Sequence, residues 1–368
     1  MLDSLIDATA LPNLHPAVVH FPIACLPLAL AFDGVGLFLR RQRWLAQAAT
    51  ALYVVGALSA WLALWAGERA ADGLVGVPAA VQPRIGEHSD WAHYAWYALI
   101  AVAAVRLVIE LRSGLKDHRG ARLGALLLGL VALGVLGKAA DLGGALVYEH
   151  GLAVKQAEPV ASEIPAADVD DGTPSPTDDS ARDRLVIGED GSLIWRPAPE
   201  DRAALGAVLT APRGSDLGSV RAQEPNGDGL RLTVDRPTTL LLPGTFGDVQ
   251  VEAEIELLDF EGSVGLVHHY QDAAERGAFA LSTEGEAILD DLRQGDRTVL
   301  DQQEFQAPNG PVVLAVSASG KHLKGLVDGK TATHGHIAPG PEGSCGLLLA
   351  GTGTLRLLRM TVEPLEPH

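Results

Sequence analysis

The sequence has few cysteines, few aromatic residues and little positive charge. Its 368 residues include two cysteines, and Cys25 and Cys345 lie in segments of different character, so a disulfide between them is not expected. Asp and Glu number 46 against 28 Lys and Arg, for a formal net charge of -18. Beyond Val154 no basic cluster occurs, which excludes nucleic acid as a partner because phosphate backbones are bound by clustered Lys and Arg.

Compact cofactor and catalytic signatures are missing as well. Neither CxxCH nor HExxH occurs in the sequence, and no strong motif indicates an enzyme. No positively charged segment precedes the first hydrophobic run, so a cleavable signal peptide is not indicated. We expect that first run itself to act as the insertion signal.

Long uncharged runs dominate residues 1–154. A helix of roughly 20 apolar residues crosses a hydrocarbon core of about 30 Å. The runs are apolar all round, whereas helices of a soluble bundle carry a polar face. The sequence therefore predicts a four-helix transmembrane bundle with spans near Val18–Leu39, Leu45–Ala66, Trp91–Leu111 and Leu123–Tyr148.

The charges of the connecting loops predict the orientation of these spans. Basic residues concentrate in the first and third loops, which are expected on the cytoplasmic side. The second loop and the N-terminal segment are acidic, so both chain ends are predicted to lie in the periplasm of a bacterium, outside the inner membrane. The basic residues are Arg40, Arg41, Arg43, Arg112, Lys116, Arg119 and Arg122.

Five histidines fall at the predicted outer ends of three spans. They are His15 and His20 on the first span, His88 and His93 on the third, and His150 on the fourth. Imidazoles from facing helices are typical ligands of b-type haem, copper or zinc. His20, His88 and His150 are the first candidate ligands. The alternative is that these side chains only hydrogen-bond helix ends and lipid headgroups.

A family resemblance covers about residues 10–154. The opening Leu14-His15-Pro16-Ala17-Val18-Val19-His20-Phe21-Pro22 and the closing segment from Asp141 to Gly151 resemble a family of predicted four-helix bacterial membrane proteins of unknown function. The resemblance implies a four-span bundle with shared outer histidines and implies no established reaction.

The region after the bundle predicts a linker and a second domain. Residues 155–185 are rich in Pro, Ala and Asp without hydrophobic periodicity, which is typical of a linker. Short alternating runs between turn signals then predict an antiparallel β-sandwich over residues 186–368. The run Val312–Ser317, the hairpin around Asp328-Gly329 and the run Gly343–Leu349 resemble concanavalin A-like and laminin-G-like jelly rolls.

Two groups in this second domain are candidates for chemistry. Glu252, Glu254 and Glu256 share one face of a predicted strand, and paired carboxylates are what glycoside hydrolysis requires. A solvated strand face explains them equally. The histidines of the domain could bind a metal or nothing, since their spacing favours neither; they are His268, His269, His334 and His336.

Three functions remain open. The first is an accessory or scaffold subunit of a respiratory or photosynthetic electron-transfer complex, which packs against other integral membrane subunits and clasps a periplasmic partner. The second is a redox protein that holds haem b or a metal with the outer histidines. The third is an envelope protein that binds or cleaves glycans.

Overall fold

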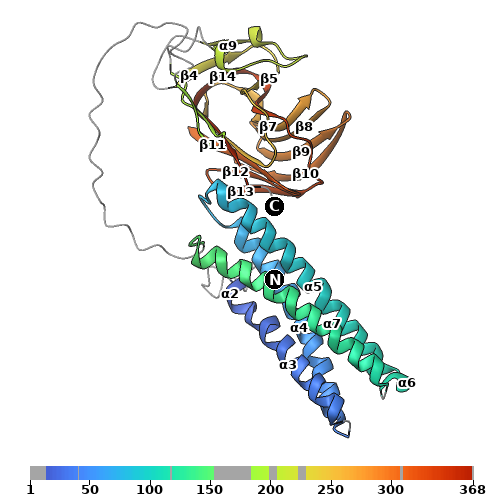
Figure 1. Ribbon diagram of the computed structural model, residues 1–368. Coiled ribbons are helices and arrows are strands. Elements are labelled where there is room, and N and C mark those ends of the chain that lie inside the picture. Colours follow the sequence, from blue (N-terminus) through green and yellow to red (C-terminus); the bar gives the residue numbers. More distant parts are fainter. Residues whose placement is uncertain are drawn as a thin grey trace, which may run out of the picture. The chain divides into compact units, whose positions relative to one another are not determined.

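The computed structural model describes residues 14–39, 41–116, 118–152, 184–198, 205–222, 229–306 and 310–366. The chain divides into two compact units (Figure 1): Met1–Gly73 with Arg84–Val154, and Leu74–Pro83 with Lys155–His368. Most of the predicted linker, up to residue 183, lies outside the described residues, as does Arg40.

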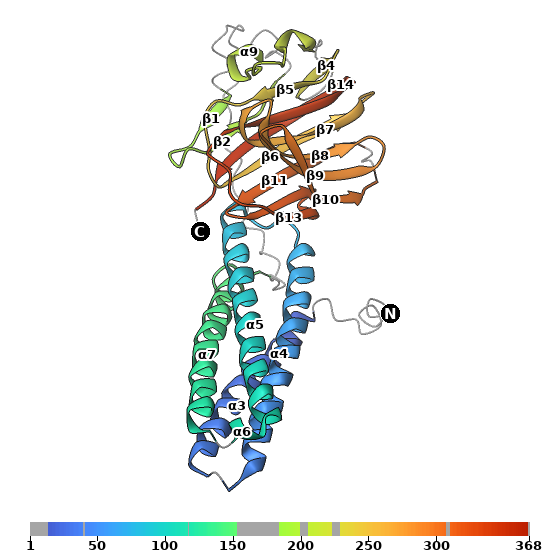
Figure 2. The same cartoon turned by 90° about the vertical axis from the view of Figure 1, so that its right-hand side faces the viewer.

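The first unit is a bundle of four long helices that are long and apolar enough to cross a membrane, as predicted. Consecutive long helices run in opposite directions, and the α3–α4 connection lies at the same end as the short helix α6 (Figures 1 and 2). The helices are α2 (His15–Val18), α3 (His20–Phe38), α4 (Arg43–Asp72), the 3-10 turn η1 (Ala79–Val81), α5 (Gln82–Leu111), α6 (Ser113–Lys116) and α7 (Arg119–Tyr148).

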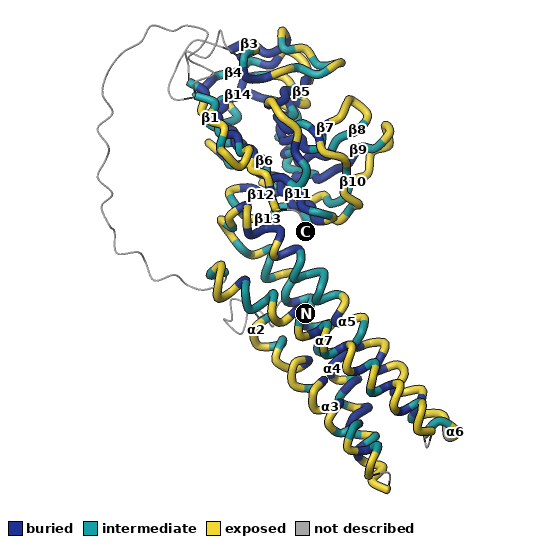
Figure 3. Tube along the Cα trace, viewed as in Figure 1, coloured by how far each residue is buried: buried dark blue, intermediate teal, exposed yellow. Residues whose placement is uncertain are grey.

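The interior of the bundle is built largely from small side chains. Ala29, Ala49 and Ala132 are fully buried, and they allow the helix backbones to approach closely, as in membrane bundles. Large apolar side chains such as Phe21 and Leu28 point outward, and exposed residues run along the outer sides of the helices (Figure 3). An apolar exterior of this kind suits a lipid environment.

A buried polar cluster joins all four long helices. Asp33 of α3 and Arg106 of α5 are both fully buried, and a guanidinium nitrogen of Arg106 lies 3.4 Å from an Asp33 carboxylate oxygen. The same nitrogen donates a hydrogen bond of 3.0 Å to the carbonyl oxygen of Ala46 on α4. Arg122 of α7 lies over Gly36, where an added Cβ would be 2.8 Å from its guanidinium. Pairing across helices is how a membrane bundle accommodates buried charge.

The second unit is an antiparallel β-sandwich. The strand β14 (Ser344–Pro364) is long enough to belong to both sheets and links them. One sheet has the order β13-β12-β11-β6-β14, with β4 and β2 also paired to β14, β3 paired to β4 and β1 to β2. The other has the order β10-β9-β8-β7-β14, with β5 also paired to β14.

In the described residues, thirteen strands besides β14 make up the two sheets, and two short helical turns accompany them. The strands are β1 (Leu185–Ile187), β2 (Leu193–Trp195), β3 (Val220–Ala222), β4 (Leu230–Val234), β5 (Thr238–Leu241), β6 (Val249–Leu257), β7 (Glu261–Asp272), β8 (Glu275–Ser282), β9 (Glu286–Arg293), β10 (Asp296–Glu304), β11 (Pro311–Ser319), β12 (His322–Val327) and β13 (Lys330–His336). Between β2 and β3 lie α9 (Leu205–Val208) and η3 (Leu217–Ser219).

Alternation of side chains places the sandwich core between the sheets. On β6, Val249, Val251 and Ile255 are fully buried while the residues between them are half-buried. Trp195, Phe279 and many aliphatic side chains complete one continuous core. The predicted jelly-roll sandwich is therefore present.

Candidate functional site

The histidines predicted at the outer ends of the spans are brought together only in part. The rings of His15 and His88 lie with their centroids 6.3 Å apart in an edge-to-face arrangement. Nδ1 of His15 lies 2.8 Å from the carbonyl oxygen of Ala63, and Nδ1 of His88 lies 3.0 Å from that of Ala139. Because a carbonyl oxygen only accepts, both Nδ1 atoms are the protonated donors and the acceptor nitrogen of each ring is Nε2. Ligating histidines are commonly oriented in this way.

The other predicted ligands of this layer have different surroundings. Nδ1 of His93 hydrogen-bonds the carbonyl oxygen of Ser89 one turn earlier, and its Nε2 lies 3.5 Å from a Glu68 oxygen. His20 and His150 are exposed. The side chains of His20, His88 and His150 do not form a group of three close ligands, because among the described residues the only such group lies in the sandwich.

The three glutamates of β6 are paired with arginines of β14. Arg356 contacts Glu256 at 2.7 Å, and Arg359 contacts Glu252 at 2.6 Å and Glu254 at 3.9 Å. Burial raises the pKa of Glu252, which the guanidinium of Arg359 opposes. These contacts form a ladder of ion pairs across neighbouring strands, which is the arrangement expected of a charged sheet face.

A second histidine pair lies in β7. The Nδ1 atoms of His268 and His269 are 2.6 Å apart, and His268 is almost fully buried above Gly277, where a Cβ would clash with its ring. His269 has a positive φ of 49° at an irregularity in the strand. Burial lowers the pKa of both rings, so both are neutral at pH 7. The pair is a buried hydrogen-bonded unit.

A shallow cavity of about 440 Å³ lies among loops of the sandwich. Its lining includes the carboxylates of Asp190 and Glu342 and the ring of Phe246. Acidic residues and an aromatic residue therefore line the same hollow.

Three further histidines converge on the hairpin of β12 and β13. The Asp328-Gly329 turn has positive φ at both residues, 50° and 73°, as a tight two-residue hairpin requires. After a one-residue shift between Gly325 and Leu326, the register pairs His322 with His336, and Lys324 with His334. Side chains alternate along a strand, so all three imidazoles stand on the same face of the hairpin.

On the opposite face of the hairpin, glycines allow close packing against the sandwich core. A Cβ at Gly325 would lie 2.1 Å from the Phe279 ring, and one at Gly335 would lie 2.7 Å from Leu300. The backbone amide of His334 donates a 2.9 Å hydrogen bond to a carboxylate oxygen of Asp301 on β10. The strands that carry the histidines are thus held rigidly.

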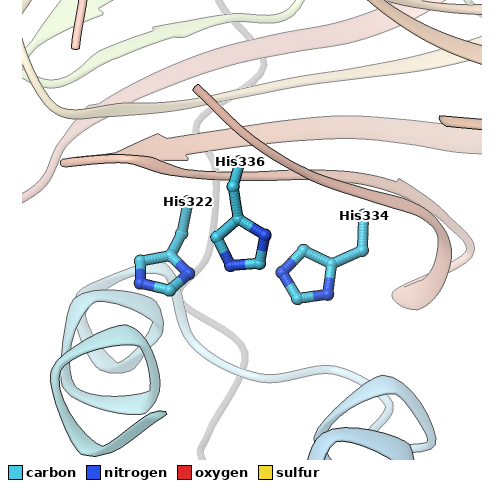
Figure 4. A group of neighbouring side chains, drawn as sticks. All are labelled: His322, His334 and His336. Atoms are coloured by element: carbon cyan, nitrogen blue, oxygen red, sulfur yellow. The ribbon is translucent and has the colours of Figure 1, made fainter. Parts of the chain in front are cut away.

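The three imidazoles face a common space (Figure 4). His336 lies between the other two, with ring centroids 4.7 Å from His322 and 4.9 Å from His334. One nitrogen of each ring lies within 4.8 Å of the corresponding nitrogens of the others. His322 is buried, His334 half-buried and His336 exposed.

The sequence interpretation missed His322 as a member of this group. It singled out His334 and His336 but could not decide between a metal and nothing from their spacing. The Asp328-Gly329 turn alone would place residue 322 opposite residue 335. A one-residue shift of the register between Gly325 and Leu326 brings it opposite residue 336, and the turn gives no signal of that shift.

Comparisons with known proteins bear on both units. No curated protein matches the chain. The sandwich resembles a carbohydrate-binding module, CBM66, from Bacillus subtilis, with 19% identity, a TM-score of 0.34, and coverage of 37% of this chain and 86% of that one. It also resembles a β-glucanase from Bacillus licheniformis, with 13% identity, a TM-score of 0.37, and coverage of 48% and 99%. A protein of unknown function with a galectin-like fold from Bacillus subtilis matches at 12% identity and a TM-score of 0.35, covering 46% and 94%. In the first unit, residues 11–156 match the model of a family described as predicted membrane proteins (DUF2231).

Proposed function

We propose that this chain is an accessory subunit of a larger membrane assembly, in which the helices pack against another integral membrane protein and the sandwich binds a partner outside the cytoplasm. The observation that carries the proposal is a face of α7 made of glycines. At Gly134, Gly137 and Gly144 an added Cβ would meet no atom within 4 Å, so these positions face away from the bundle. Gly129, in contrast, faces Tyr53 inside it. Outward glycines let the backbone of a neighbouring helix approach closely.

The absence of an assembled catalytic group among the candidates also favours a binding role. The carboxylates of Glu252, Glu254 and Glu256 are each held by an arginine, whereas a glycosidase keeps one carboxyl as an acid and the other available as nucleophile or base. The assembly in question would be a respiratory or photosynthetic electron-transfer complex of the inner membrane.

The orientation belongs to the same proposal. Arg41 and Arg43 flank the α3–α4 connection, and Arg112 and Arg119 flank α6 at the same end of the bundle. By the positive-inside rule this end faces the cytoplasm, and the C-terminal sandwich is exported. Alkaline phosphatase fused behind His368 should be active, and the same enzyme inserted after Gly114 should not. The reverse pattern would refute the orientation.

Native electrophoresis in mild detergent tests the subunit role. The full chain should migrate in a complex larger than one chain in its micelle, and Gly134→Leu with Gly137→Leu should return it to the single-chain position. The double variant should keep its thermal stability, because both side chains point away from the bundle. Gly129→Leu is the matched control and should unfold the bundle instead, since its Cβ position lies 2.7 Å from the Tyr53 hydroxyl. A wild-type chain that migrates alone would contradict the proposal.

A second candidate function is haem or metal binding by His15 and His88. Their shared orientation through Nδ1–carbonyl hydrogen bonds is the specific observation in its favour. The visible absorption spectrum of the purified chain tests it. A Soret band that disappears in His88→Ala would replace the accessory role with an electron-transfer role, and a colourless chain would remove haem from consideration.

A further inference from the structure

We propose that His322, His334 and His336 form a binding site for a late first-row divalent metal ion, with Zn²⁺ as the representative cation. The proposal concerns the sandwich alone and holds whether or not the chain is a subunit of an assembly. It begins from the hairpin register, which places three imidazoles on one face of two adjacent strands.

The nature of the ligands selects the class of metal. Imidazole nitrogen suits Zn²⁺, Cu²⁺, Ni²⁺ and Co²⁺, whereas Mg²⁺ and Ca²⁺ require sets of oxygen ligands. The carboxylate of Asp301, which contacts the strand at His334, is engaged with the backbone amide of His334 and with the amide groups of Gln302 and Gln303. The carboxylate of Asp328, in the turn, accepts from the backbone amide of Val313. The three ligand side chains are therefore all nitrogen donors.

The distances fit a metal centre after a small closure. Zn–N bonds are about 2.0–2.1 Å, so two nitrogens in a tetrahedral site are separated by about 3.3 Å. The ligand nitrogens here lie within 4.8 Å of one another. Rotation of the imidazoles about their side-chain bonds brings them together without movement of the strands, because the rings already converge from adjacent positions (Figure 4).

The packing of the hairpin holds the three histidines in position. Gly325 and Gly335 allow the opposite face of the hairpin to pack closely against Phe279 and Leu300, and this packing fixes the position of the strands. A metal ion gains affinity when its ligands are held before it arrives. Exposure of His336 leaves a way in from solvent.

Three protein ligands leave a fourth position for water or a ligand from outside. The group of close metal-ligand side chains found in the described part of the chain has three members. Zinc sites with three protein ligands bind an exchangeable fourth ligand, whereas closed structural sites have four. We therefore assign this site to the exchangeable class.

Titration of the full, tag-free chain in mild detergent with ZnCl₂ tests the proposal. After treatment with a chelator, the protein should bind one Zn²⁺ per chain in competition with a chromophoric chelator. CoCl₂ should produce the visible absorption of tetrahedral Co²⁺. His334→Ala and His336→Ala should each weaken Zn²⁺ binding by about 100-fold or more, since even indirect partners of a ligand alter affinity 10–100-fold.

Control variants separate this site from the other histidines. His336→Cys supplies a thiolate, which is also a zinc ligand, and should retain the site. His150→Ala changes an exposed histidine outside this group and should bind Zn²⁺ as the wild type does. Because His336 is exposed, its loss should leave the circular dichroism spectrum unchanged. Stoichiometric binding that survives His336→Ala, or that is lost in His150→Ala, would overturn the assignment, and so would a chain that binds no Zn²⁺.

Discussion

Replacement of Asp33 tests whether the buried charge cluster holds the bundle together. Asp33→Ala leaves the guanidinium of Arg106 fully buried without its carboxylate partner. Removing one member of a buried ion pair costs about 3–5 kcal/mol. Arg106 keeps the carbonyl of Ala46 at 3.0 Å and a Glu110 oxygen at 3.9 Å, so we expect the lower end, about 3 kcal/mol.

The reciprocal change should cost less. Arg106→Met leaves the carboxylate of Asp33 buried without the guanidinium of Arg106. A carboxylate can become neutral by taking up a proton, whereas a guanidinium cannot lose its proton in a protein. The cost is then that of a buried polar group without a partner, about 1–3 kcal/mol. Asp33→Leu combined with Arg106→Met removes both charges at similar total volume and should restore stability to within about 1 kcal/mol of the wild type.

Equilibrium unfolding in detergent micelles, followed by tryptophan fluorescence, measures these differences. Five of the six tryptophans lie in the first unit, so a Trp195→Phe background makes the signal specific to the bundle. The three variants and the wild type form a double-mutant cycle. If Asp33→Ala costs less than about 1 kcal/mol, or if the double variant is no more stable than Asp33→Ala, the cluster is not the electrostatic unit argued here.

Further predictions concern the sandwich. Arg359→Ala should lower the free energy of unfolding by less than about 1 kcal/mol, because its partner Glu252 is partly exposed, and should raise the pKa of Glu252 further. Since burial depresses the pKa of His268, thermal stability should be constant above pH 6.5 and fall as pH drops toward the folded pKa, with a smaller fall in His268→Asn. Lys324→Met should strengthen Zn²⁺ binding about 5- to 10-fold in the same titration, because a cation beside His334 repels the metal by roughly 1 kcal/mol. Zn²⁺ at 100 times its dissociation constant should stabilise the chain by about 2.7 kcal/mol, and EDTA should reverse the shift in melting temperature; stability unaffected by either would count against the site.

The periodicity of the sequence was sufficient for the two architectures but not for the ends of their elements. Apolar runs located the four spans, yet α4 continues to Asp72 instead of ending near Ala66, because Glu68 and Arg69 remain helical beyond the hydrophobic stretch. The predicted run Gly343–Leu349 is only the first part of one long strand, β14, which continues to Pro364. Gly351 and Gly353 interrupt the apolar pattern because the backbone oxygens of Glu261 and Asp259 approach too closely for a side chain.

Charge or polarity masks the strand pattern in β9 and β13. Strand β9 carries Asp290 and Asp291 in its middle, and the first is buried between Arg276 and Arg297. Strand β13 consists of small and polar residues on both faces. In each case the stabilising contact comes from another strand, which a local pattern does not contain.

The same limit applied to the charged residues of the bundle. Asp33 stands out in the sequence as a carboxylate within a span, but its partner Arg106 is 73 positions away on another helix. Which helix faces meet depends on packing of small residues such as Gly36 and Ala49, and a single sequence does not specify that.

The histidine group of the sandwich likewise depends on a feature that its turn does not specify. The turn pairs Leu326 with Thr331, but the register shifts by one residue before Gly325, which pairs with Thr333. A slip back to the register of the turn would move His334 and His336 to the core side now occupied by Thr333 and Gly335. That slip is opposed by the core itself, since no side chain fits at Gly335 beside Leu300. The contacts that stabilise the sandwich therefore also keep the three imidazoles on one outer face, so a metal site here requires no stabilising element beyond those the fold already needs.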